Sequence, residues 1–125
     1  MTRPPRRSAA RTTACLRSAA GVAGGIAMLL RPDAVAAAAA GDGTRPRAEL
    51  IVVLGLRELT QGLVILRWPA RPIATVGMAV DLLHGMSMLA ARRLTPTFRT
   101  AATRSAVAAF AGATALLPAA MGGHG

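Results

Sequence analysis

The sequence predicts an all-α fold, a four-helix transmembrane bundle, and three observations support this. Hydrophobic residues make up 53% of the 125 residues, yet the aromatic residues are only two Phe and one Trp. A water-soluble core buries most of its area with large side chains, whereas helices in lipid pack closely through small residues. Four apolar runs follow one another along the chain, with Arg or Pro residues between them. These features are typical of a small multi-pass integral membrane protein.

The first quarter of the chain is basic, then apolar, then rich in alanine. We expect residues 1–13 to form a disordered basic tail, because they combine arginines with two prolines. The first apolar run, 14–31, is marginally long for a span, which needs about 17–25 residues. The following "DAVAAAAAGDG" is expected to form a short interfacial helix that ends at Gly41 or Gly43.

The same quarter also has the composition of a signal peptide. Its basic start, apolar run and small residues would place cleavage within residues 1–40. Arg31 and Asp33 fall between the apolar run and the candidate cleavage site, which favours a retained first helix. In that interpretation residues 14–121 form one membrane domain, and cleavage stays the alternative.

The remaining three spans are separated by clear breaks. The second run, 48–66, is long enough as a helix to cross the hydrocarbon core of a bilayer. "RWPARP" ends this run with an interfacial Trp and two prolines, so the third run, 73–91, is expected to pack against it as a firm hairpin. The fourth run, 103–121, is weaker because it consists mostly of alanine, and 122–125 form a short tail.

The net charge of +10 comes from arginines that are scattered between the apolar runs. No aromatic platform or nucleic-acid motif accompanies them, so we expect no nucleic-acid partner. The lipid bilayer is the expected partner, with a homo-oligomer or another membrane protein as a further candidate. The two sides carry nearly equal numbers of arginines, and Arg17 is counted with the N-terminal arginines on the inner side. This N-terminal cluster favours a plasma-membrane protein with both termini in the cytoplasm. The single Cys15 excludes an internal disulfide.

Two polar stretches interrupt the second and third runs with one repeated pattern. "ELTQGL" and "DLLHGM" both read acid, Leu, any residue, Gln or His, Gly, and then Leu or Met. On a helix the acid and the amide or imidazole share a face, because residues three apart are neighbours. The predicted intramembrane polar cluster therefore consists of Arg57, Glu58, Gln61, Asp81 and His84.

A hairpin of the second and third runs would place these polar groups at matching depths. It would place Glu58 at the same depth as Asp81, and Gly55 at the same depth as His84. A lone charge at mid-bilayer costs at least about 2.5–3.5 kcal/mol, and Arg57 compensates only one of the two carboxylates. We therefore expect one proton to be shared among Glu58, Asp81 and His84.

This cluster has a structural and a functional interpretation. Interhelical polar contacts in lipid contribute about 1 kcal/mol each and can fix register, while intramembrane ionisable groups also mark ion or substrate paths. A metal site at Glu58, Asp81 and His84 lacks a recognisable ligand spacing. A triad of Asp81, His84 and Ser87 would not converge, because the three residues lie side by side on one helix. We expect no catalytic, cofactor-binding or metal-ligating residues and no cofactor.

"LGLRELTQGLVIL" and "AVDLLHGMSMLAARR" resemble the small four-helix integral membrane proteins of unknown function common in actinobacteria. Those proteins carry a Gly-x-Arg block with Gln-Gly and an Asp-x-x-His block, and the likeness covers residues 48–93. The chain is more distantly similar to the DoxX-like group. The resemblance implies a membrane location and a helical bundle, and it brings no activity.

Three functional hypotheses follow from these patterns. The first is a non-enzymatic membrane protein with a structural or accessory role, whose polar cluster holds its helices together. The second is a small proton-coupled carrier that uses Glu58, Asp81 and His84. The third is a subunit of a membrane redox or enzyme complex, for which the chain carries no specific motif.

Overall fold

The computed structural model describes residues 5–122, with side chains from residue 9 onward, and all its regular elements in this range are helical. The expected all-α fold is therefore confirmed. Within these residues there are five α-helices, namely four long ones and the short alanine-rich helix that the sequence analysis expected between the first two spans. The elements are α1 (Pro5–Leu30), α2 (Pro32–Ala40), α3 (Ala48–Arg67), α4 (Arg71–Leu94), the 3-10 turn η1 (Pro96–Phe98) and α5 (Arg99–Met121).

The N-terminal segment corrects one expectation. Residues 5–13, which we expected to be disordered, belong to α1. Pro5 suits the first position of a helix, and the following alanines and arginines are strong helix formers. Residues 1–4 of the expected tail, and 123–125 at the other end, lie outside the described residues.

Proline and glycine set the breaks around α2. Pro32 lacks the N–H that would continue α1, and it starts α2 with Asp33 in the first turn, where a carboxylate complements the helix dipole. Gly41 ends α2 with a φ of 56°, a conformation that glycine adopts without strain. The short helix therefore ends at the first of the two glycines that we expected.

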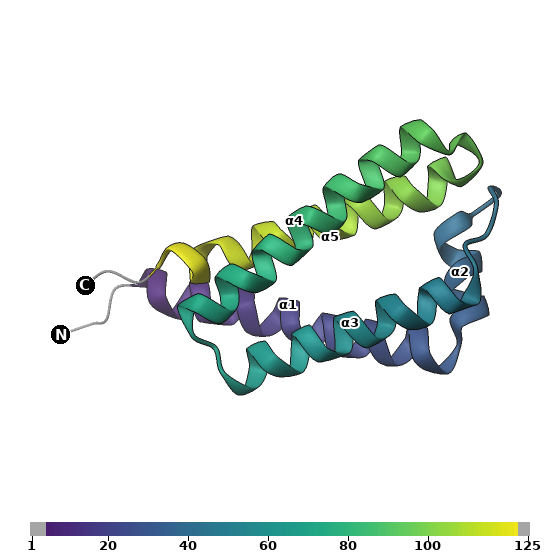
Figure 1. The fold of residues 1–125 in the computed structure, drawn as a ribbon. Helices are drawn as coiled ribbons and strands as arrows, with labels where there is room; N and C mark the ends of the chain where they lie inside the picture. Colours follow the sequence, from purple (N-terminus) through teal and green to yellow (C-terminus); the bar gives the residue numbers. More distant parts are fainter. Residues whose placement is uncertain (1–4, 123–125) are drawn as a thin grey trace.

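The long helices form two pairs. Figure 1 shows α1 beside α3 and α4 beside α5, and the most extensive contacts are made within these pairs. Contacts between α3 and α4 are few, although the two helices are consecutive in the chain. The expected α3–α4 hairpin packing is therefore wrong, and the two pairs diverge toward the end of the molecule where α2 lies.

Glycines explain why α3 packs against α1. A Cβ atom at Gly55 would lie 2.7 Å from the Cβ of Met28, and one at Gly62 would lie 2.6 Å from the carbonyl oxygen of Ser18. These two glycines are seven residues apart on one face of α3, so they let the α1 backbone approach closely along two turns. Gly55 therefore faces α1 and not His84, which overturns the expected register.

In the α4–α5 pair a glycine also allows close packing, here against an aromatic side chain. A Cβ atom at Gly85 would lie 2.8 Å from ring atoms of Phe110, so this glycine on α4 accommodates an aromatic ring from α5. Nearer the turn after α3, the Nε of Arg71 donates to the carbonyl oxygen of Ala120 at 2.8 Å. This bond joins the start of α4 to the last turn of α5.

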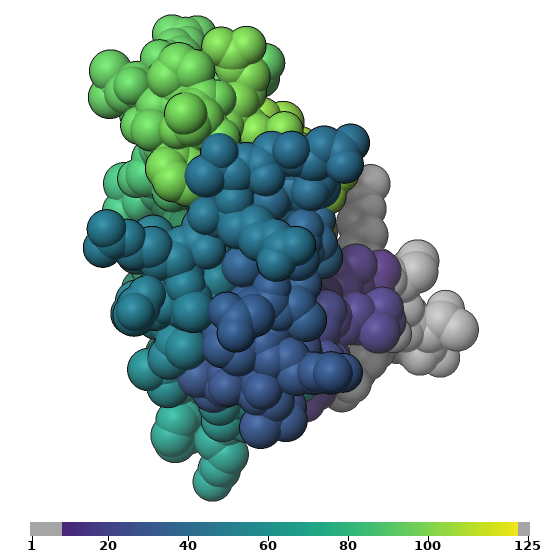
Figure 2. Space-filling view, turned by 90° about the vertical axis from the view of Figure 1, so that its right-hand side faces the viewer, coloured from purple at the N-terminus to yellow at the C-terminus, as the bar shows by residue number. Residues whose placement is uncertain are grey.

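The short helix α2 connects the two pairs at their divergent end. It packs against both α3 and α5, and the Arg104 side chain on α5 donates to the carbonyl oxygen of Ala38. That carbonyl belongs to the last turn of α2, where the backbone acceptors have no partner within the helix. Figure 2 looks at the molecule from this end, with α2 and the segment that follows it in the foreground.

Within the part of the chain that the structure describes, three helical segments are long and apolar enough to cross a membrane: Ala9–Leu30, Arg71–Leu94 and Pro96–Met121. The helix α3 is 20 residues long but is not among them. Each of its 18-residue windows contains Arg57 and Glu58 together with Glu49 or Arg67, which makes three charged residues. The helix α3 therefore has the length of a membrane span, but its charged residues need an explanation.

Candidate functional site: an ion cluster between the helix pairs

An arginine from α1 lies at the centre of the site. The Arg17 Nη2 lies 2.9 Å from Oδ1 of Asp81, and its Nη1 lies 3.1 Å from Oε2 of Glu58. The Arg17 Nε also donates to Oδ2 of Asp81 at 3.2 Å, so the planar guanidinium holds that carboxylate through both oxygens. One side chain of α1 therefore binds both α3 and α4.

A second arginine, on α3, completes the cluster. The Arg57 Nη2 donates to Oε1 of Glu58 at 2.6 Å, and its Nη1 lies 3.5 Å from Oδ1 of Asp81. Gln61, one turn further along α3, accepts from Arg57 at 3.3 Å and donates to Asp81 at 3.3 Å. The same amide donates to the carbonyl oxygen of Gly77, so Gln61 also joins α3 to the α4 backbone.

The cluster is balanced in formal charge, with two arginines and two carboxylates. Asp81 is fully buried, and the side chain of Arg17 is 9% exposed. For comparison, a single uncompensated charge at the centre of a bilayer costs at least about 2.5–3.5 kcal/mol. Arg17 therefore provides the second positive charge that the sequence analysis lacked, and the expected shared proton is no longer needed for charge balance.

Two glycines make room for these charges. A Cβ atom at Gly112 of α5 would lie 2.8 Å from Oδ2 of Asp81, and one at Gly21 of α1 would lie 2.6 Å from Nη1 of Arg17. A methyl group at either position would push against a guanidinium or a carboxylate. The cluster therefore depends on glycines from two helices, in addition to the four charged residues.

His84 lies outside the ion network. Its Nε2 is 2.8 Å from the Oγ of Ser105, so the imidazole joins α4 to α5 inside the second pair. Among the described residues, no group of three or more His, Cys, Asp or Glu side chains is placed to hold a metal ion. Which of the two groups donates depends on the imidazole tautomer, and the imidazole has no hydrogen bond to either carboxylate of the cluster.

The sequence pattern located most of this cluster and missed its centre. Of the predicted residues, the structure joins Arg57, Glu58, Gln61 and Asp81 directly and places His84 apart. Arg17 was counted among the flanking arginines, although it lies inside the first apolar run. An arginine within a span is rare and marks a partner, so the same argument that selected Arg57 would have selected Arg17.

Two cavities adjoin the cluster, one toward each end of the bundle. The first, of about 460 Å3, lies between the α3 and α4 halves nearest their connecting turn. The second, of about 400 Å3, lies among α1, α3 and α5 and extends toward the α2 end. Arg57 lines both cavities, and Glu58 lines the second. The ion cluster therefore separates two spaces that are otherwise lined mainly by apolar or small residues.

The arrangement is suited to holding helices together and to binding a proton or a small polar group. The bonded side chains of the cluster are two guanidinium groups, two carboxylates and one amide, and the nearby His84 imidazole bonds the Ser105 hydroxyl. No family model, no curated protein and no solved structure matches the chain.

Proposed function

We propose that the protein is a small multi-pass integral membrane protein of the plasma membrane with a non-enzymatic structural or accessory role. In this role its ion cluster fastens the α1–α3 pair to the α4–α5 pair. Three helical segments with the length and composition of membrane spans support the membrane location. The repeated acid-x-x-Gln/His-Gly motif supports kinship with the small four-helix membrane proteins that it resembles.

One observation carries this proposal: Arg17 binds carboxylates on two other helices, and these helices belong to different pairs. In lipid there is no hydrophobic driving force between helices, so polar contacts and close packing must hold them together. A guanidinium with two carboxylates can do this across a wider spacing than glycine contacts allow. The cluster then holds the two helix pairs together, and the coupling free energy between Arg17 and Asp81 measures its contribution to stability.

A double-mutant cycle tests this coupling. We expect Arg17→Leu to lower the free energy of unfolding by about 3–5 kcal/mol, because it leaves the two carboxylates of the cluster with a single cation, Arg57. Adding Asp81→Asn removes that excess charge and should restore part of the loss, so the coupling should exceed about 0.5 kcal/mol. Unfolding of the full chain in mixed micelles, with increasing dodecyl sulfate, gives the four values.

The matched control replaces an acid outside the cluster. Asp33 lies on the short helix α2 and is exposed, so Arg17→Leu and Asp33→Asn should be additive. Additive effects in both cycles would contradict a fastening role for the cluster.

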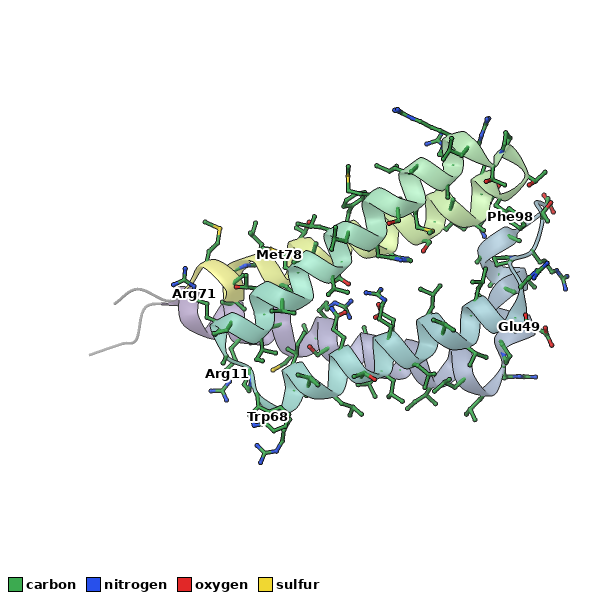
Figure 3. All side chains as sticks on the ribbon, viewed as in Figure 1. Arg11, Glu49, Trp68, Arg71, Met78 and Phe98 are labelled. Atoms are coloured by element: carbon green, nitrogen blue, oxygen red, sulfur yellow. The ribbon has the colours of Figure 1, made fainter. Side chains whose placement is uncertain are left out.

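We also propose α3 as a fourth span, with both termini on the cytoplasmic side. Its two central charges are paired in the cluster, which lowers the cost of placing α3 in lipid. Arg11, Trp68 and Arg71 lie at one end of the molecule and Glu49 and Phe98 at the other (Figure 3). In a Cys15→Ser background, an impermeant thiol reagent should label Thr97→Cys but not Ala70→Cys in intact cells, and the reverse pattern would invert the orientation.

A small proton-coupled carrier is the second candidate, favoured by the cavity that reaches Glu58. The Glu58 side chain is 16% exposed, so it is the carboxylate of the cluster with access to that space. A carrier predicts proton flux in proteoliposomes that Glu58→Gln abolishes and that Glu49→Gln, at an exposed position on the same helix, retains. The fastening role predicts that the wild-type protein, Glu58→Gln and Glu49→Gln all give no proton flux above that of protein-free liposomes. The flux is measured with a pH-sensitive dye inside the liposomes.

A further inference from the structure

The cavity between α3 and α4 has features of a binding site that the fastening role does not use. Its volume of about 460 Å3 falls within the range of about 300–1,000 Å3 of small-molecule sites. Most of its lining is aliphatic and comes from both helices, including Val64, Ile73 and Val80. Leu56 and Val76 also line it and are 52% and 62% exposed, so the cavity opens to the side of the bundle.

The polar groups of this cavity all come from one helix. Arg57, Thr60 and Gln61 line it from α3, beside the ion cluster. The Arg57 guanidinium has five N–H donors, and its Nε is buried without a hydrogen-bond partner. An unsatisfied donor of this kind needs an explanation, and an acceptor oxygen of a bound molecule beside the Arg57 guanidinium would supply one. The site therefore combines an apolar body with a donor at its inner end.

The charge balance of the cluster decides the charge of the ligand. Two arginines already match two carboxylates, so an anionic headgroup would leave the buried site with one excess negative charge. A cationic group would meet Arg57 and be repelled. A neutral molecule with a carbonyl or ester oxygen supplies the missing acceptor without disturbing this balance.

We propose that the α3–α4 cavity binds a neutral lipid-like molecule, with its apolar chain between the two helices and an acceptor oxygen at the Arg57 guanidinium. The inference rests on the proposed membrane location, because the side opening would then face the acyl chains from which such a molecule enters. Few contacts join α3 to α4, so the chain can enter between them without breaking either helix pair.

Monoolein is a suitable probe, because it is neutral and has one acyl chain with an ester carbonyl. Oleate carries the same chain with a negative charge, and octadecene carries no oxygen. Each is titrated into the full chain in dodecyl maltoside micelles, and the thermal midpoint of unfolding is followed. A ligand that binds only the folded protein raises this midpoint with concentration. We expect monoolein to raise it, and oleate and octadecene to leave it within error of the untreated protein.

Two exposed valines provide a matched pair of variants. Val76 lines the cavity and is 62% exposed, whereas Val107 on α5 is 64% exposed and lines neither cavity. Val76→Phe should fill the cavity and weaken the apparent affinity for monoolein at least about tenfold, and Val107→Phe should leave it unchanged. If Val76→Phe does not fold, the comparison of the three probes on the wild-type chain decides alone.

Several results would overturn the proposal. An equal response of the wild-type chain and Val76→Phe would place the monoolein elsewhere on the protein. An equal effect of octadecene would remove the role of the acceptor oxygen, and a larger effect of oleate would contradict the charge argument. None of these results would alter the coupling between Arg17 and Asp81, so a failure of this inference is distinguishable from a failure of the fastening role.

Discussion

The closest backbone contacts lie within the helix pairs, and the pairs are joined to each other by the ion cluster together with direct packing of α1 against α5. Inside the α1–α3 pair, Gly25 and Gly55 bring two backbones together, and a Cβ atom at Gly25 would lie 2.7 Å from the Gly55 carbonyl oxygen. Between the pairs, the long side chains of Arg17 and Arg57 reach the Asp81 carboxylate on α4. Small residues suit helices that run side by side, and ion pairs suit helices that diverge. Glycine contacts therefore occur where two helices run side by side, and long charged side chains bridge helices that are further apart.

Of the two tests at glycines, the one with the larger expected effect concerns the contact within a pair. Gly62→Leu would place a branched side chain against the backbone carbonyl of Ser18, which lies 2.6 Å from the Cβ position and cannot move without shifting α1. We expect a loss of about 3 kcal/mol in the free energy of unfolding, the upper end for overpacking. Gly24→Leu is the control, since nothing lies within 4 Å of its Cβ position. Equal losses in the two variants would show that glycine contacts do not hold this pair.

A smaller effect tests the contact between the pairs. Gly112→Ala would add a methyl group 2.8 Å from the Asp81 carboxylate, and we expect a loss of about 1–2 kcal/mol, at the lower end for overpacking. Gly24→Ala should instead stabilise by about 0.4–1 kcal/mol, because alanine restricts the unfolded chain. Opposite signs in the same micellar unfolding experiment would support the ion contact. A stabilising Gly112→Ala would indicate that the ion cluster yields to the methyl group and that the fastening is loose.

The sequence predicted the bounds of the helices better than it predicted which helices pack together. Apolar runs bounded by Arg and Pro gave the ends of α3 within one residue, and Pro32 and Gly41 delimited α2 as expected. The pairing went wrong because chain order suggested that α3 packs against α4. The glycines at positions 55 and 62 were assigned to that interface, whereas they contact α1. A glycine face shows that a helix is approached closely, but it does not identify the helix that approaches.

The residues of the site could also be predicted only in part. Arg57, Glu58, Gln61 and Asp81 were recognisable because polar residues in an apolar run need partners. Arg17 obeys this rule too, but its run was weak and began near other arginines, so it was counted as a flank. His84 matched the motif by position, and its partner Ser105 was outside the motif. Spacing along one helix identifies a shared face, while the partner across the interface depends on the fold.

The bridge made by Arg17 also has a consequence for biosynthesis. Within the cluster, the α1–α3 pair contributes Arg17, Arg57 and Glu58, a formal charge of +1, and the α4–α5 pair contributes Asp81, a charge of −1. In the proposed membrane location, the positive half would leave the ribosome and reach the bilayer first, and its cluster would hold an uncompensated arginine until α4 emerges. Neither half is electrically complete alone, so each inserted half attracts the other, and the order of translation becomes the order of charge neutralisation.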